Sequence, residues 1–154
     1  MKVLNKVLIG VASVAMLTAC ASKSDYATFH SKAVEAGEKA KEVSFSKVVL
    51  SGSYVDEDGK KQSYDNVTIK FEKGSYAAGG LTDTTLAQAG AVIYLTAMQA
   101  QLVGESEYNT YYAGSSFKVV YEKDGNKETT LWNQYGLLTS VKSGSDSLKV
   151  SYKK

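Results

Sequence analysis

The chain of 154 residues carries 18 lysines and 16 acidic residues, has a formal net charge of +2 and contains no proline. Arginine is absent, which excludes bidentate guanidinium recognition of phosphate or carboxylate groups. The single cysteine excludes an internal disulfide, and together with one histidine it is too little for a Cys/His zinc site. The length suits one domain built around one hydrophobic core.

The first 19 residues have the three-part organisation of a secretory signal peptide. Lys2 and Lys6 give a positively charged start, and residues 7–19 (VLIGVASVAMLTA) form an uncharged apolar run. A membrane-spanning helix needs about 20 apolar residues, so this run is too short for a permanent span. It ends at Cys20, and the small polar residues that follow offer nothing to bury a free thiol.

Four residues at this boundary resemble the lipobox of bacterial lipoprotein precursors: Leu17, Thr18, Ala19 and Cys20. The resemblance implies that the sulfur of Cys20 receives a diacylglyceryl group and that the chain is cut just before it. Acyl chains such as palmitate would then anchor the protein to a bacterial cell membrane on its extracytoplasmic face. We therefore expect a signal peptide at 1–19, a lipidated tether at 20–24 and one domain at 25–154.

Removing residues 1–19 also removes the excess positive charge. Lys2 and Lys6 are the surplus lysines, and their loss leaves 16 lysines against 16 acidic residues. A basic surface is the first sign of nucleic-acid binding, so the balanced total predicts no nucleic-acid partner. It also predicts that attachment to the membrane comes from acyl chains, of which two or more hold firmly, and not from a polybasic segment.

Residues 25–43 are predicted to form a helix, because apolar side chains recur at steps of three and four. Ser24 is the expected N-cap, since its hydroxyl can accept a bond from the first helical turn. His30 stands beside the apolar stripe without a second ligand and is expected at the surface. The stripe consists of Tyr26, Phe29, Ala33, Ala36, Ala40 and Val43.

A hairpin is expected next. Residues 45–55 are rich in β-branched and aromatic side chains, and residues 65–73 alternate, with Val67, Ile69 and Phe71 on one face. Between them, residues 56–61 (DEDGKK) contain the Asp-Gly pair that favours tight turns. This acidic cluster lacks the later ligands of a calcium loop, so it predicts a turn and no metal.

Residues 84–104 contain no charged side chain, which predicts a helix buried on all sides with its core at 86–103. Six Gln and Thr residues within it argue against a membrane span. Residues 105–114 are expected to be a loop rich in tyrosine. Four short strands separated by Gly-containing turns follow and predict a meander: 116–123, 127–134, 137–142 and 147–152.

The expected fold class is therefore α+β: an N-terminal helix, a two-strand hairpin, a buried central helix and a four-strand antiparallel meander. A helix apolar on all sides needs something to wrap it, so about six strands should form one curved antiparallel sheet packed on the helices. This order of elements resembles the lipoprotein-carrier fold and its glycolipid-binding lipoprotein relatives. The resemblance implies an acyl-binding cavity between the sheet and residues 86–103, but no ligand residue carries over to this chain.

The aromatic side chains leave two interpretations open. Tyr108, Tyr111 and Tyr112 crowd one segment, and Trp132 has polar neighbours on its own strand. Such residues are favoured at binding surfaces, where sugars or peptides could stack on them. The alternative is that Trp132 packs under the first helix and the tyrosines cover an edge of the sheet.

The chemistry of the chain argues against an enzyme. Hydrolytic serine chemistry needs a base beside the nucleophile, and His30 lies on a polar helix with no Gly-x-Ser-x-Gly turn anywhere. We predict no catalytic residue, no metal and no cofactor. The expected function is a membrane-anchored binding or interaction domain for an unknown envelope protein, and the alternative is a carrier of an acyl or other apolar ligand.

Overall fold

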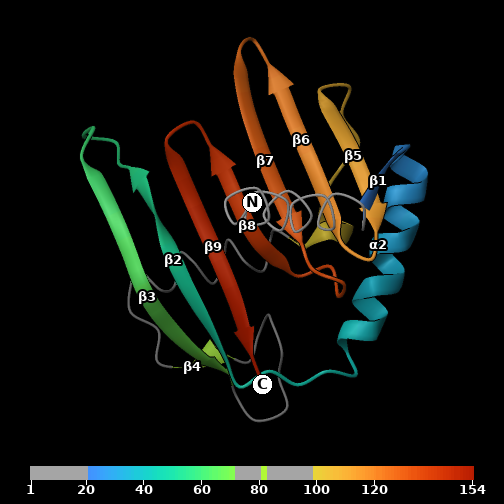
Figure 1. The fold of residues 1–154 in the computed structure, drawn as a ribbon, viewed down its shortest axis with the longest axis horizontal. Helices are drawn as coiled ribbons and strands as arrows, with labels where there is room; N and C mark the ends of the chain where they lie inside the picture. The colour runs from blue at the N-terminus through green and yellow to red at the C-terminus, as the bar shows by residue number, and fades with distance from the viewer. Residues whose placement is uncertain (1–20, 72–80, 83–98) are drawn as a thin grey trace, which may run out of the picture.

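The structure, a computed structural model, describes residues 21–71, 81–82 and 99–154. These residues form one open antiparallel sheet of nine strands in the order β1-β5-β6-β7-β8-β9-β2-β3-β4 (Figure 1). The described part holds one α-helix, α2 (Tyr26–Ala40), and a short 3₁₀ helix, η1 (Ala100–Leu102). The strands are β1 (Ala21–Ser24), β2 (Lys47–Val55), β3 (Lys61–Phe71), β4 (Leu81–Thr82), β5 (Asn109–Gly114), β6 (Phe117–Lys123), β7 (Asn126–Trp132), β8 (Leu138–Ser143) and β9 (Asp146–Lys153).

The meander is longer than the sequence predicted. The expected four strands are present as β6 to β9, and β5 precedes them where a tyrosine-rich loop was expected. The predicted hairpin, β2 and β3, joins the meander because β2 pairs with β9, with Lys47 opposite Lys153. An antiparallel sheet was therefore predicted correctly, but its strand count was too low.

The residues expected to form a tether are instead the first strand of the sheet. Ala21 lies opposite Gly114 and Ser24 lies opposite Tyr111, so β1 pairs with β5 along its whole length. The polar composition of residues 21–24 gave no hydrophobic alternation from which a strand could be predicted. The chain therefore enters the folded sheet at Ala21.

Pairing register divides the side chains of the sheet between two faces, because residues directly opposite each other in neighbouring strands point to the same side. Tyr111, Val119, Thr130 and Val141 form one such row on the face that packs against α2, which we call the inner face. The opposite face, here the outer face, includes the adjacent row of Tyr112, Lys118, Leu131, Ser140 and Lys149. All four side chains of the first row are buried.

Helix α2 lies at the β1–β5 side of the sheet (Figure 1). Its predicted apolar stripe is confirmed, since Phe29, Ala33, Ala36 and Ala40 are its buried residues. The predicted N-cap is wrong: the carboxylate of Asp25 accepts from the Thr28 amide at 2.7 Å. The hydroxyl of Ser24 is buried without a hydrogen-bond partner.

Phe29 joins the helix to the core through aromatic contacts. Its ring lies 5.2 Å from that of Tyr111, 5.8 Å from that of Phe117 and 6.2 Å from that of Trp132, centroid to centroid. The last two contacts are edge-to-face, an arrangement that aromatic quadrupoles favour. Phe29 has 0 % and Trp132 2 % of its surface exposed, so the space between α2 and the inner face is filled by side chains.

The buried central helix cannot be assessed over most of its predicted length, because residues 83–98 lie outside the described residues. At its C-terminal end the prediction is wrong. Gln99 and Val103 have extended backbones, and residues 100–102 between them form the 3₁₀ turn η1. The Ala100 amide donates to the Gly136 carbonyl at 3.0 Å, which ties this turn to the β7–β8 connection.

Candidate functional site

Cys20, the predicted lipidation site, lies outside the described residues, but its position in the chain is fixed by its neighbour. Ala21, the residue that follows Cys20 in the chain, pairs with Gly114 at the end of β5 and therefore lies at that end of the sheet. The same end holds the β5–β6 and β7–β8 connections and the last residues of β9. We call it the anchor end of the sheet.

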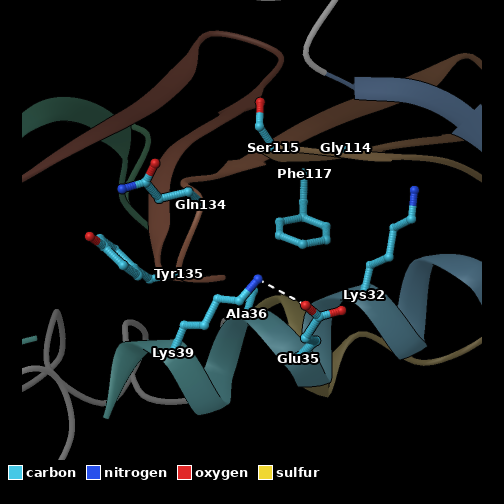
Figure 2. A pocket seen from close by; sticks show the side chains of 9 residues that line it. All are labelled: Lys32, Glu35, Ala36, Lys39, Gly114, Ser115, Phe117, Gln134 and Tyr135. Carbon is cyan, nitrogen blue, oxygen red and sulfur yellow. Dashed lines mark hydrogen bonds and ion pairs between the residues drawn. The ribbon is translucent and has the colours of Figure 1, made fainter. Parts of the chain in front are cut away.

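A groove of about 450 Å³ opens at the anchor end, between α2 and these two connections (Figure 2). Helix α2 contributes Lys32, Glu35 and Lys39, which project from successive turns because residues three or four apart share one face of a helix. The opposite wall comes from Gly114 and Ser115 of the β5–β6 connection and from Gln134 and Tyr135 of the β7–β8 connection. Phe117 and Ala36 also line the groove.

The groove combines a polar rim with an apolar floor. Phe117 is 3 % exposed and Ala36 is 5 % exposed, so both lie deep in it. Lys39 Nζ lies 2.8 Å from Glu35 Oε1 at the rim, and both side chains remain largely exposed to solvent (Figure 2). An exposed ion pair of this kind contributes little to stability. Breaking it therefore costs little, and either side chain can bind a charged group of a ligand instead.

Glu35 is held in its ionised form. The hydrogen bond from Lys39 and the charge of that lysine lower the pKa of the Glu35 carboxyl, and the charge of Lys32 lowers it further. A general acid that works near neutral pH needs a raised carboxyl pKa, so this lowered pKa does not suit Glu35 to that role. The groove is therefore suited to binding polar and charged groups.

A second, smaller pocket of about 80 Å³ lies on the neighbouring side of α2. Gly37 and Lys41 line it from the helix, Gln99 and Gln101 from the segment around η1, and Leu137 from the β7–β8 connection. The Gln101 side chain packs over Gly37, where a Cβ would meet the Gln101 carboxamide carbon at 3.2 Å. The volume of this pocket leaves room for only a few atoms.

Trp132 belongs to the core and not to a binding surface. It is 2 % exposed and packs under α2 against Phe29, so the packing interpretation is correct for this residue. The tyrosines divide: Tyr111 is 5 % exposed, and its hydroxyl donates to the Gly104 carbonyl at 3.0 Å. Tyr112 and Tyr108 instead carry the ammonium groups of Lys118 and Lys123, 4.1 Å and 4.5 Å from their ring centroids.

The acidic cluster before β3 is a turn, as predicted. The Asp56 carboxylate accepts from the Lys60 amide at 2.8 Å and from Gln62 Nε2 at 2.7 Å, and these bonds lower its pKa. Among the described residues, no group of three or more His, Cys, Asp or Glu side chains could hold a metal ion. The His30 ring lies 5.6 Å from that of Tyr26 on α2, and His30 is not among the residues that line the groove.

The groove was missed at the sequence level because its two walls are about 75 to 100 residues apart in the chain. The helical spacing of Lys32, Glu35 and Lys39 was visible, but a charged stripe is the normal solvent face of an amphipathic helix. The predicted strand 127–134 ends at Gln134, and Tyr135 falls between it and the next predicted strand. Only the tertiary arrangement places them opposite α2.

No helix within the described ranges is both long enough and apolar enough to cross a membrane. Comparison with known proteins identifies no relative: no family model, no curated protein and no solved structure matches the chain.

Proposed function

We propose that this chain is the precursor of a bacterial lipoprotein whose mature part is anchored outside the cytoplasm through acyl chains on Cys20. The observation that carries the proposal is the order Leu17, Thr18, Ala19, Cys20 directly after the uncharged run 7–19. Acylation needs a thiol at the membrane surface with small side chains beside the scissile bond. Cys20 supplies the thiol, Thr18 and Ala19 are the small residues before it, and all four positions match the lipobox.

The folded part is proposed to act as a non-catalytic binding domain that recognises an envelope protein through the groove. Support comes from the place of the groove at the anchor end, which Ala21 and Gly114 join to Cys20. An extended polypeptide segment with charged side chains fits the polar rim, and an apolar side chain fits over Phe117.

The anchor is tested by intact-mass analysis of the protein from bacterial membranes. We expect the wild-type chain to lack residues 1–19 and to gain the mass of a diacylglyceryl group, while Cys20→Ser keeps the full precursor mass. Thr18→Ser is the matched control, because it keeps a small residue in the lipobox and should be processed normally. A wild-type chain that keeps residues 1–19 and carries no lipid would disprove the anchor.

The groove is tested by placing a photo-crosslinking side chain at Gln134 in the full chain, in living cells. The matched position is Ser151 on the outer face, which is also exposed. Specific adducts with one envelope protein at 134, lost when Lys32 and Lys39 are both changed to Glu, are the expected result. Native mass spectrometry gives the contrary outcome: a co-purifying lipid-sized mass with no protein adduct would favour the carrier of an apolar ligand.

A further inference from the structure

The outer face of the sheet gathers most of the lysines that the structure describes. Register places these side chains on one side, because each lies opposite another outer-face residue in the neighbouring strand. All except Lys118 are exposed. The outer-face lysines are Lys23, Lys47, Lys61, Lys70, Lys118, Lys127, Lys142, Lys149 and Lys153.

Acidic side chains are almost excluded from this face. Among its paired positions within the described ranges, Glu122 is the single acid, and its carboxylate lies 3.2 Å from Lys127 Nζ. Asp65 sits at the irregularity of β3 and is outside the paired register. The proposed mature chain has no net charge, yet its lysines and its acids lie on different parts of the structure. The composition alone did not predict this separation.

The acids gather elsewhere. Four lie on or beside α2, on the inner side of the sheet: Asp25, Glu35, Glu38 and Glu42. Others lie in the turns that join β2 to β3, β6 to β7 and β8 to β9, which Figure 1 shows together at the end of the sheet opposite the C-terminus. The acids in and beside these turns are Asp56, Glu57, Asp58, Asp124 and Asp146. The end far from Cys20 thus holds a second group of acids.

The positive charge is concentrated toward the anchor end. Lys153 lies directly opposite Lys47, and Lys47 lies directly opposite Lys70, which makes a row of three lysines across β9, β2 and β3. Directly opposed side chains in an antiparallel sheet are about 5 Å apart at Cβ, and like charges in such positions are destabilising. An anionic surface against this row would offset the repulsion.

We propose that the outer face docks flat on the anionic headgroups of the bilayer that holds Cys20. The inference rests on the proposed function for the anchor, because acylation of Cys20 would keep the anchor end within one residue of that bilayer. Lysines near an anionic membrane surface each strengthen binding by about fivefold.

A bilayer fits this face better than a soluble polyanion. The lysines are spread over seven strands of the sheet, a breadth that suits an extended anionic surface, and neither of the two described pockets is lined by an outer-face lysine. Leu131 on β7 is 37 % exposed, and Tyr112 lies in the same row on β5, with Lys118 between them and its Nζ 4.1 Å from the Tyr112 ring centroid. Apolar and tyrosine side chains of this kind favour the headgroup boundary of a membrane.

The docking is tested with the full chain carrying Cys20→Ala, so that no acyl chain contributes to binding. Binding is measured by co-sedimentation with vesicles of phosphatidylcholine alone, or of phosphatidylcholine and phosphatidylglycerol in equal parts. Residues 1–19 can bind vesicles by themselves and are the same in every variant. We expect the folded part to add further binding, and only to the vesicles that contain phosphatidylglycerol. The variant Lys47→Gln, Lys149→Gln, Lys153→Gln should lose roughly 100-fold in affinity. It should also be less sensitive to raising the salt from about 0.1 M to about 1 M.

The matched control removes three lysines that are not on the outer face: Lys41→Gln, Lys60→Gln, Lys123→Gln. All three are exposed, so the control changes net charge equally and leaves residues 1–19 unchanged. Retained binding of this control, beside the loss in the outer-face variant, supports the proposal. Equal loss in both variants overturns it, as does binding to soluble polyphosphate without binding to phosphatidylglycerol vesicles.

The outcome is separable from that of the anchor. If intact-mass analysis finds no lipid on Cys20, yet the outer-face variant alone loses vesicle binding, then the anchor is wrong and the docking face stands. If Cys20 is acylated and both lysine variants bind the vesicles equally, then the anchor stands and the docking face is wrong.

Discussion

The inner and outer faces of the sheet are formed by alternate residues of the same strands, and the two faces differ in burial and in charge. On the inner face, Tyr111 and Trp132 pack with Phe29 into a filled core. On the outer face, their neighbours Tyr112 and Leu131 stand among lysines. Stability and surface charge are thus assigned to alternate positions, so adjacent substitutions should affect one property without the other.

The largest difference should come from Trp132 and Leu131, which are adjacent and point to opposite faces. Trp132→Ala removes a side chain that is 2 % exposed and leaves a cavity under α2, so it should lower the free energy of unfolding by about 3–5 kcal/mol. Leu131→Ala should lower it by less than about 1 kcal/mol. Urea unfolding measures both, and similar losses would mean that the faces are not distinct.

Gly52 tests the close contact between β2 and β9 on the inner face. A Cβ there would collide with the Ser147 carbonyl oxygen and lie 2.9 Å from the Leu148 Cα, and this backbone cannot move without opening the pair. Gly52→Ala should cost about 2–4 kcal/mol. Gly59→Ala, in the β2–β3 turn with φ +76° and nothing near its Cβ position, should cost about 1 kcal/mol from backbone strain alone. Thermal unfolding of the two variants should keep this order.

Removing only the hydroxyl of Tyr111 or of Tyr112 should give a smaller difference in stability between the two faces. The Tyr111 hydroxyl accepts from the Ser106 amide at 2.9 Å and donates to the Gly104 carbonyl, so Tyr111→Phe should cost about 1–2 kcal/mol. Tyr112→Phe keeps the ring under Lys118 and should leave the urea midpoint unchanged. If both substitutions lowered the free energy of unfolding equally, the hydrogen bonds of the Tyr111 hydroxyl would not be what stabilises residues 104–111.

The smallest effects are expected at the start of α2, where the predicted and observed caps are neighbours. Asp25→Ala should lower the unfolding temperature by a few degrees, whereas Ser24→Ala removes an unpartnered buried hydroxyl and should be neutral or slightly stabilising. The hydrogen bond from the Thr28 amide lowers the pKa of Asp25. The stabilisation by the ionised Asp25 carboxylate is therefore complete above the pKa of an ordinary aspartate. It is lost as the pH falls through the lowered pKa of Asp25 in the folded protein. The difference in unfolding temperature between wild type and Asp25→Ala should therefore disappear as the pH is lowered from 6 to 2.

The sequence was sufficient wherever burial and periodicity agree. The stripe of Phe29, Ala33 and Ala36 located α2, and the alternation around Val119 located β6 within one residue. Prediction failed for β1 and β5. Their pairing partners decide their conformation, and the four residues of β1 lack an apolar alternation that would have revealed it.

The groove and the outer face escaped prediction for a related reason. Lys47 and Lys153 are more than 100 residues apart in the chain, and only the β2–β9 register places them together. Total charge cannot reveal such a grouping, because the acids that balance it lie on α2 and in distant turns. Cys20 is the opposite case, since a local order of four residues carries all the information for its proposed modification.

The pairing of β1 with β5 has a consequence for the order of events during biosynthesis. Ala21 finds its partner Gly114 only after about ninety more residues have been made, which takes about 5–20 s of translation. Throughout that interval residues 21–24 lack their neighbouring strand. Pairing with β5 then closes them into the edge of the sheet, so β1 forms only after most of the chain has been made.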